Sequence, residues 1–116
     1  MGAYWLKDIL LTKDRVIEVT CFNNRTCEVI FTDNDGYDAT IRVYVPSPAE
    51  AENDYLIDQD VVARAIELNA THIVYEQWIV GPTLAAKEHA GYYDIEIYPV
   101  RDFVRDIARG LIIGRL

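Results

Sequence analysis

The sequence predicts a single mixed α/β domain, in which a central mixed β-sheet is flanked by helices. Two observations support this prediction. Between residues 15 and 45, apolar side chains recur with a period close to two, which is typical of short strands linked by hairpins. Between residues 58 and 109, helical and strand periods alternate, and Gly, Pro or Asn stands where the period changes. We therefore expect a three-stranded antiparallel meander followed by helix, strand, helix, strand and helix.

The length and composition indicate one globular unit. The chain has 116 residues, of which 51% are hydrophobic and 26% are charged, so we treat residues 1–116 as one domain and exclude a disordered class. No apolar run approaches the roughly 20 residues that a membrane span needs. The first residues also lack the basic and then apolar order of a signal peptide. We expect a cytoplasmic protein without a membrane partner.

Charge and cysteine content limit the possible partners and cofactors. Nineteen acidic residues against eleven basic ones give a net charge of −8, which repels nucleic acid. Cys21 and Cys27 are the only cysteines, and no His stands at zinc-ligand spacing from them. We therefore predict no metal site, and we expect two reduced thiols in a reducing cytoplasm. Whether the two cysteines pair is left open by the sequence.

The N-terminal half should contain one short helix and the meander. Residues 4–11 could form the helix, with Trp5, Ile9 and, less clearly, Leu6 turned inward. The turns of the meander fall at residues 23–24 and 33–36, because Asn, Asp and Gly accept the positive φ that hairpin loops need.

An even register keeps the apolar rows of the three strands on one side of the sheet. This register places three pairs opposite one another: Cys21 with Cys27, Ile17 with Phe31, and Glu28 with Arg42. The other face then carries a polar row made of Glu18, Glu28, Thr40, Arg42 and Tyr44. We favour the interpretation that this row is the solvated side of the sheet, with one cross-strand ion pair.

The next stretch begins with a loop over residues 46–54, which are rich in Pro, Ala and acidic residues. A helix follows, with Asp58 as N-cap and Asn69 as its stop. Residues 71–80 predict a buried strand, because the run is short and rich in Ile, Val, Tyr and Trp.

The remaining elements are marked by Pro and Gly. Pro82 suits the first position of a helix over residues 83–90, and Gly91 suits the left-handed residue after it. Residues 93–98 alternate as a half-exposed strand near the sheet edge. The last helix is predicted over residues 100–109, with one apolar stripe, and Gly110 ends it.

This order of elements resembles the restriction-endonuclease-like fold of the PD-(D/E)xK nucleases. The best local support lies between residues 58 and 107, in four runs: Ala70-Thr71-His72-Ile73-Val74, Ala85-Ala86, Asp94-Ile95-Glu96-Ile97 and Phe103-Val104. In that family, an Asp on the second strand and an acid-x-Lys on the third bind a divalent metal and orient the attacking water. The resemblance places Glu28, Thr40 and Arg42 at these positions, with Glu18 on the same face. Thr40 offers no anionic ligand, and Arg42 stays protonated and cannot act as a base.

We therefore expect a binding or assembly module of unknown ligand, without catalytic activity and without a cofactor. The alternative is a DNA endonuclease of the resembling superfamily, which would use Mg²⁺. The sequence names no ligand, substrate or pathway.

The C-terminal tail predicts a homodimer. Residues 111–116 contain four large apolar side chains and one charge, and such a segment should not lie free in water. It either covers a second copy of the chain or packs against its own core, and the sequence supports both alternatives equally. The predicted binding residues are Tyr44, Tyr98, Leu111 and Ile113.

Overall fold

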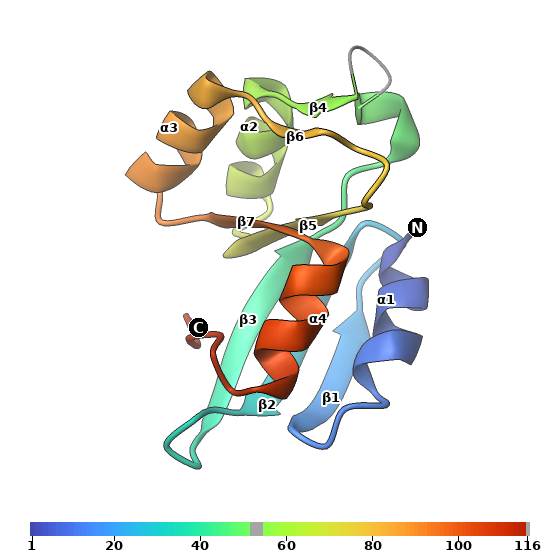
Figure 1. Cartoon of the computed structure of the whole chain (residues 1–116), viewed down its shortest axis with the longest axis vertical. Coiled ribbons are helices and arrows are strands. Elements are labelled where there is room, and N and C mark those ends of the chain that lie inside the picture. The colour runs from blue at the N-terminus through green and yellow to red at the C-terminus, as the bar shows by residue number, and fades with distance from the viewer. Residues whose placement is uncertain (52–54, 116) are drawn as a thin grey trace.

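A computed structural model describes residues 1–51 and 55–115 of the chain. Its centre is a five-stranded mixed sheet in the order β1-β2-β3-β5-β7 (Figure 1). The strands are β1 (Val16–Cys21), β2 (Thr26–Thr32), β3 (Asp38–Tyr44), β5 (His72–Tyr75) and β7 (Glu96–Pro99). The first three form the antiparallel meander, while β5 and β7 run parallel to β3. The predicted fold class is confirmed.

The register of the meander agrees with the prediction at two of the three pairs. Cys21 lies opposite Cys27, and Glu28 lies opposite Arg42. The third pair was wrong, because Val16 rather than Ile17 faces Phe31. A β-bulge between Val16 and Glu18 adds one residue to β1, so that Ile17 turns outward and is exposed.

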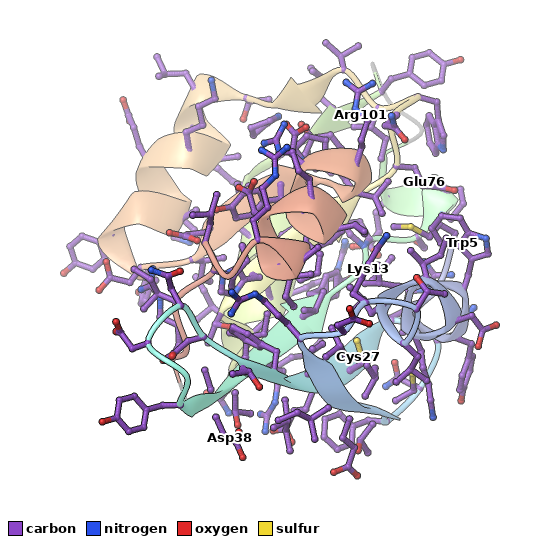
Figure 2. All side chains as sticks on the ribbon, turned by 60° about the horizontal axis from the view of Figure 1, so that its bottom comes forward. Trp5, Lys13, Cys27, Asp38, Glu76 and Arg101 are labelled. Carbon is purple, nitrogen blue, oxygen red and sulfur yellow. The ribbon has the colours of Figure 1, made fainter. Side chains whose placement is uncertain are left out.

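Two helices cover one face of the sheet, α1 (Ala3–Leu10) and α4 (Val100–Ala108). Helix α1 buries Ala3, Leu6 and Leu10, and it leaves Trp5 half exposed on its outer side (Figure 2). The prediction that Trp5 faces inward was therefore wrong, whereas Leu6 is buried and Ile9 is half buried. The backbone N–H of Ala3 donates to the carbonyl of Asn24 at 2.9 Å, and this contact fixes the rotation of the helix.

Helix α4 follows the predicted pattern. Val100, Phe103 and Ile107 are buried against the core, and Arg101 and Arg105 of the helix, with Arg109 at its C-cap, are exposed. The helix ends at Gly110, which has a φ of 72° in the left-handed region that glycine adopts without strain.

A second pair of helices, α2 (Gln59–Glu67) and α3 (Leu84–Tyr92), packs on the other face of the sheet. The carboxylate of Asp58 caps α2 by accepting from the N–H groups of Asp60 and Val61, as predicted. A small sheet of β4 (Leu56–Ile57) and β6 (Gly81–Pro82) lies beside these helices (Figure 1).

Several predicted boundaries in this region were wrong. The strand expected over residues 71–80 is only β5, and Pro82 belongs to β6 rather than to a helix. Helix α3 begins after Thr83, whose hydroxyl accepts from the N–H of Ala86 at 3.0 Å, and Gly91 lies inside it. Asp94, with a φ of 57°, is the left-handed residue that precedes β7. The 3-10 helix η1 (Pro48–Ala51) occupies part of the predicted loop 46–54, whose residues 52–54 lie outside the described residues.

The two pairs of helices cover different amounts of the sheet. On one face, α1 lies over the meander and α4 also packs against β5 and β7, whereas on the other face α2 and α3 pack against β5, β7 and the end of β3. One side of the meander is therefore uncovered, and we call it the open face. It carries, by register, Glu18, Thr20, Phe22, Thr26, Glu28, Ile30, Thr40, Arg42 and Tyr44.

Candidate functional site

Arg42 is the centre of the polar groups on the open face. Its Nη2 atom lies 2.6 Å from Oε1 of Glu28, and its Nη1 atom donates to the carbonyl of Leu68 at 3.2 Å. The guanidinium carbon also lies 5.6 Å from the centre of the Phe22 ring, within the range of a cation–π contact. The predicted cross-strand pair is therefore present, and Arg42 links the meander to the end of α2.

Glu18 and Thr40 share the open face with this pair, and both lie opposite Ile30 in the register. The Glu28 carboxylate already has the Arg42 guanidinium as its partner, and Thr40 is neutral, so neither residue offers a free anionic ligand to Mg²⁺. Within residues 1–51 and 55–115, no three His, Cys, Asp or Glu side chains form a group that could hold a metal ion.

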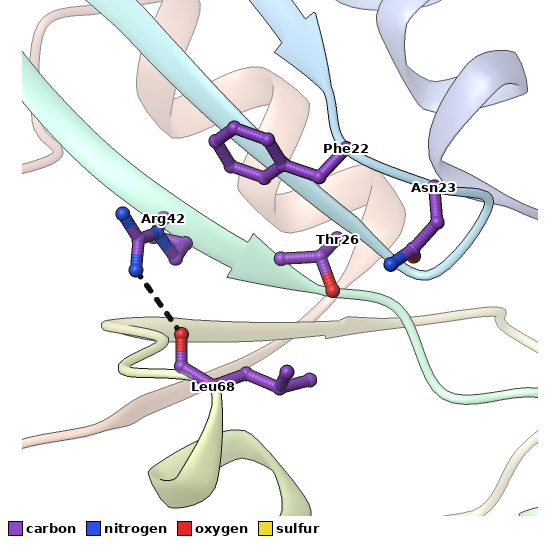
Figure 3. Close-up of a pocket in the computed structure, with 5 residues that line it drawn as sticks. All are labelled: Phe22, Asn23, Thr26, Arg42 and Leu68. Atoms are coloured by element: carbon purple, nitrogen blue, oxygen red, sulfur yellow. Dashed lines mark hydrogen bonds between the residues drawn. The ribbon is translucent and has the colours of Figure 1, made fainter.

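A pocket opens between the β1–β2 hairpin, β3 and the end of α2. It has a volume of about 270 Å³ and is lined by Phe22, Asn23, Thr26, Arg42 and Leu68 (Figure 3). Sequence reasoning placed Arg42 on this face but missed the other four residues. The one signal in the sequence was Phe22, a large apolar residue that stands on the polar side of the strand directly before a turn.

Tyr44 lies on the same face but in a different environment. Its side chain is buried beneath α2, and its hydroxyl donates to the carboxylate of Glu50 at 2.7 Å. Glu50 in turn pairs with Arg64 at 2.6 Å. Burial, together with the bond to Glu50, raises the pKa of Tyr44 above its ordinary value. Tyr44 therefore joins the sheet to η1 and α2 and presents little surface to a partner.

His72 is a buried titratable group on the opposite face of the sheet. Its Nδ1 atom lies 2.8 Å from the hydroxyl of Thr71, and its Nε2 atom lies 3.2 Å from the carboxylate of Glu96. Burial lowers the pKa of His72 to about 4, although the Glu96 charge opposes this shift, so the ring is neutral at pH 7. Thr71 also bonds to the backbone of Arg42. This chain of groups therefore holds β3, β5 and β7 together.

The C-terminal tail divides between the core and the surface. Ile112 is buried in the chain's own core, whereas the side chains of Leu111 and Ile113 are 59% and 69% exposed. We call these two residues the apolar strip. The N–H of Arg115 donates to the carbonyl of Thr40 at 2.9 Å, and its guanidinium reaches Glu96 at 3.2 Å, so the tail is held in place on both sides of the strip.

The tail runs between β3 and β7, because Arg115 contacts Thr40 on β3 and Glu96 on β7, while Ile112 belongs to the core beneath α1 and α4. As predicted, β7 stands at the sheet edge. Tyr98 on this strand is half buried, with its ring 6.1 Å from that of His72 and 6.0 Å from that of Phe103. Of the four predicted binding residues, Leu111 and Ile113 are thus the most exposed, Tyr98 is intermediate and Tyr44 is buried.

A second apolar surface lies at the other edge of the sheet. Tyr4 and Leu11 of the first helix and its flank, together with Ile17 at the bulge, are each about half exposed and line a common groove. Sequence reasoning missed this surface, because it assumed strict alternation along β1 and turned Ile17 inward.

The two cysteines lie opposite one another beneath α1. Both are free thiols, and burial raises the pKa of Cys27 to about 12, which keeps it protonated at neutral pH. We predict that they stay reduced in the isolated protein. Two thiols titrated after unfolding without reductant would agree with this prediction, whereas a titre of zero would show a disulfide.

No protein-family model matches the chain, and no match was found among curated proteins or solved structures. No helix in the described residues has the length and apolar composition needed to cross a membrane.

Proposed function

We propose that the chain is a binding or assembly module that acts without catalysis and forms a homodimer through the apolar strip and the edge of β7. The exposure of Leu111 and Ile113 carries this proposal. Large aliphatic side chains that stand next to each other on a surface mark an interaction site more often than isolated ones do. Closed two-fold pairing is the commonest arrangement that buries such a surface on both subunits.

The apolar strip is already ordered in the single chain. The N–H of Leu111 donates to the carbonyl of Asp106 at 2.8 Å, and Ile112 anchors the segment in the core. A surface that is already ordered loses little conformational entropy on association. The adjacent β7 is an edge strand, which can present unpaired backbone groups to a second copy.

The distribution of charged residues also favours a dimer interface in this region. The chain carries a net charge of −8, but residues 100–116 contain four of the eleven basic residues and only two of the nineteen acidic ones. An interface here keeps the acidic remainder of the two copies apart, which limits their mutual repulsion.

Sedimentation equilibrium tests the proposal. The full chain should sediment as a dimer, and a Leu111→Asp/Ile113→Asp variant should sediment as a monomer with an unchanged circular dichroism spectrum. Deleting the tail would be a poorer test, because it also removes the buried Ile112. The matched control is Ile17→Asp, which alters the other edge of the sheet and should leave the dimer intact. A monomeric full chain would refute the proposal, and dissociation by Ile17→Asp alone would move the interface to β1.

The alternative function is a Mg²⁺-dependent DNA endonuclease, in which Glu28, Thr40, Arg42 and Glu18 would form the site. Its support is that the register brings these four residues to one face. Incubation of plasmid DNA with the protein and Mg²⁺ or Mn²⁺ tests it. Cleavage that disappears in Glu28→Ala would favour the nuclease over the non-catalytic module, and intact DNA would refute it.

A further inference from the structure

Thr26 is a buried polar residue without a hydrogen-bond partner. Its side chain is on β2, the residue is 3% exposed, and the hydroxyl oxygen has no partner among the described residues. The Nε atom of Arg42 is in the same situation. Buried polar groups are nearly always paired in folded proteins, and leaving one unpaired destabilises the fold. Two such groups on neighbouring strands therefore call for an explanation.

The residues Thr26 and Arg42 both line the pocket of the open face. Figure 3 shows Thr26 between Asn23 and Phe22 on one side and Leu68 on the other, with its hydroxyl on the side of Leu68. The carbonyl oxygen of the Asn23 side chain already accepts from the N–H of Arg25 at 2.7 Å, so its amide hydrogens are the groups left to pair. The pocket thus offers three donors, from Asn23, Thr26 and Arg42, and their complement is a hydrogen-bond acceptor.

The walls of the pocket are apolar. Phe22 and Leu68 are 54% and 40% exposed and lie on opposite sides of Thr26. The volume of about 270 Å³ lies near the lower limit for ligand pockets, which suits a ligand of fragment size. A ligand that fits both features combines a small apolar group with an acceptor.

The charges around the pocket determine whether a charged or a neutral acceptor group of the ligand fits. The positive charge of Arg42 is already matched by Glu28 at 2.6 Å. A ligand carboxylate would be repelled by Glu28 and by the net charge of −8, whereas a neutral carbonyl would not. We propose that this pocket binds a neutral amide carbonyl attached to a small apolar group, with the apolar group between Phe22 and Leu68 and the carbonyl accepting from Thr26 and its neighbouring donors.

The proposal predicts opposite effects on stability and on binding when Thr26 is replaced by Val. Valine keeps the shape of the side chain and removes the unpaired hydroxyl, so the midpoint of urea unfolding should rise or stay unchanged. Binding should weaken by about tenfold, because one hydrogen bond to the ligand is lost.

The experiment is a titration of the ¹⁵N-labelled full chain with N-acetyl-leucinamide, followed by NMR. The titration should reach about 50 mM, since a ligand of this size binds with a Kd on the order of millimolar. Saturable shifts at the five pocket residues, weakened by Thr26→Val, support the proposal. The matched control is Thr20→Val, which changes an exposed threonine of the same face outside the pocket lining and should leave the titration unaltered.

Three outcomes would overturn the inference. These are an absence of saturable shifts at the pocket, equal binding by Thr26→Val, and tighter binding of N-acetyl-leucine, which carries a carboxylate. The pocket and the apolar strip have no residue in common, so the Leu111→Asp/Ile113→Asp variant should bind the probe as the unmodified chain does. Failure of the dimer proposal would therefore leave this result unaffected.

Discussion

The antiparallel and parallel halves of the sheet differ in how they are covered. In β2, Val29 and Phe31 are buried beneath the helices, while Glu28 and Ile30, which alternate with them along the strand, are only half buried on the open face. In β5, all four residues are buried, because helices lie on both sides. Hairpins can join antiparallel strands directly, whereas parallel strands need crossover segments that cover the sheet. The open face and its pocket therefore belong to the antiparallel half.

The two halves also end in different edges. The edge strand β1 carries a bulge, a feature that often blunts an edge against further pairing. The edge strand β7 pairs without irregularity and lies next to the tail, whose Arg115 reaches Glu96 at its start. This difference is why we assign the dimer contact to the parallel half and the ligand pocket to the antiparallel half.

The largest expected loss of stability comes from a comparison of the two faces of β2. Replacing the buried Phe31 by Ala should lower the free energy of unfolding by about 3–5 kcal/mol, because it leaves a cavity under the helices. Replacing its neighbour Ile30 by Ala should cost about 1 kcal/mol or less, since that side chain is only half buried. Urea unfolding of both variants measures the difference. Equal losses would mean that the open face is covered in solution.

The next effect is the pH dependence of stability caused by His72, which lies in the parallel half of the sheet, where helices cover both faces. The pKa of this residue is about 4 in the folded chain and 6.5 in the unfolded chain, so only the unfolded chain binds the proton between these values. Stability should therefore fall by about 1.5 kcal/mol as the pH drops from 6.5 to 5. In His72→Gln, urea unfolding should show a flatter dependence on pH over this interval. An unchanged slope would contradict the burial argument.

The smallest effect concerns the ion pair on the open face. Glu28 and Arg42 are partly exposed, so replacing Glu28 by Ala should change the free energy of unfolding by about 1 kcal/mol or less. Urea unfolding at low and high salt would measure it, and the difference should shrink as salt screens the pair. A loss of several kcal/mol would show that the pair is structural and that the open face is less accessible than we describe.

Local signals in the sequence were sufficient for part of this structure. The apolar stripe of α4 and the glycine after it predicted that helix correctly, and Asp58 predicted the start of α2. The alternation along the meander predicted the pairing of Glu28 with Arg42, because one face is polar and the register can slip only in steps of two.

Features that depend on distant contacts were not predictable in the same way. The N–H of Thr83 donates to the distant carbonyl of Ile57 at 2.9 Å, and Thr83 is the extended N-cap of α3, which the sequence did not distinguish from a helix that starts at Pro82. The strand β5 ends at Tyr75, directly before the polar pair Glu76-Gln77, and the prediction ran past this signal because apolar residues resume at Trp78. The pocket joins a hairpin to Leu68, more than forty residues away along the chain. Only the fold brings these groups together.

Hydrogen exchange at two protein concentrations tests most directly whether the parallel half forms the dimer contact. The account predicts that, at the higher concentration, amides of β7 and of residues 111–115 exchange more slowly, while those of β1 exchange at the same rate. Exchange that is independent of concentration throughout the chain, or slowed at β1 instead, would contradict it.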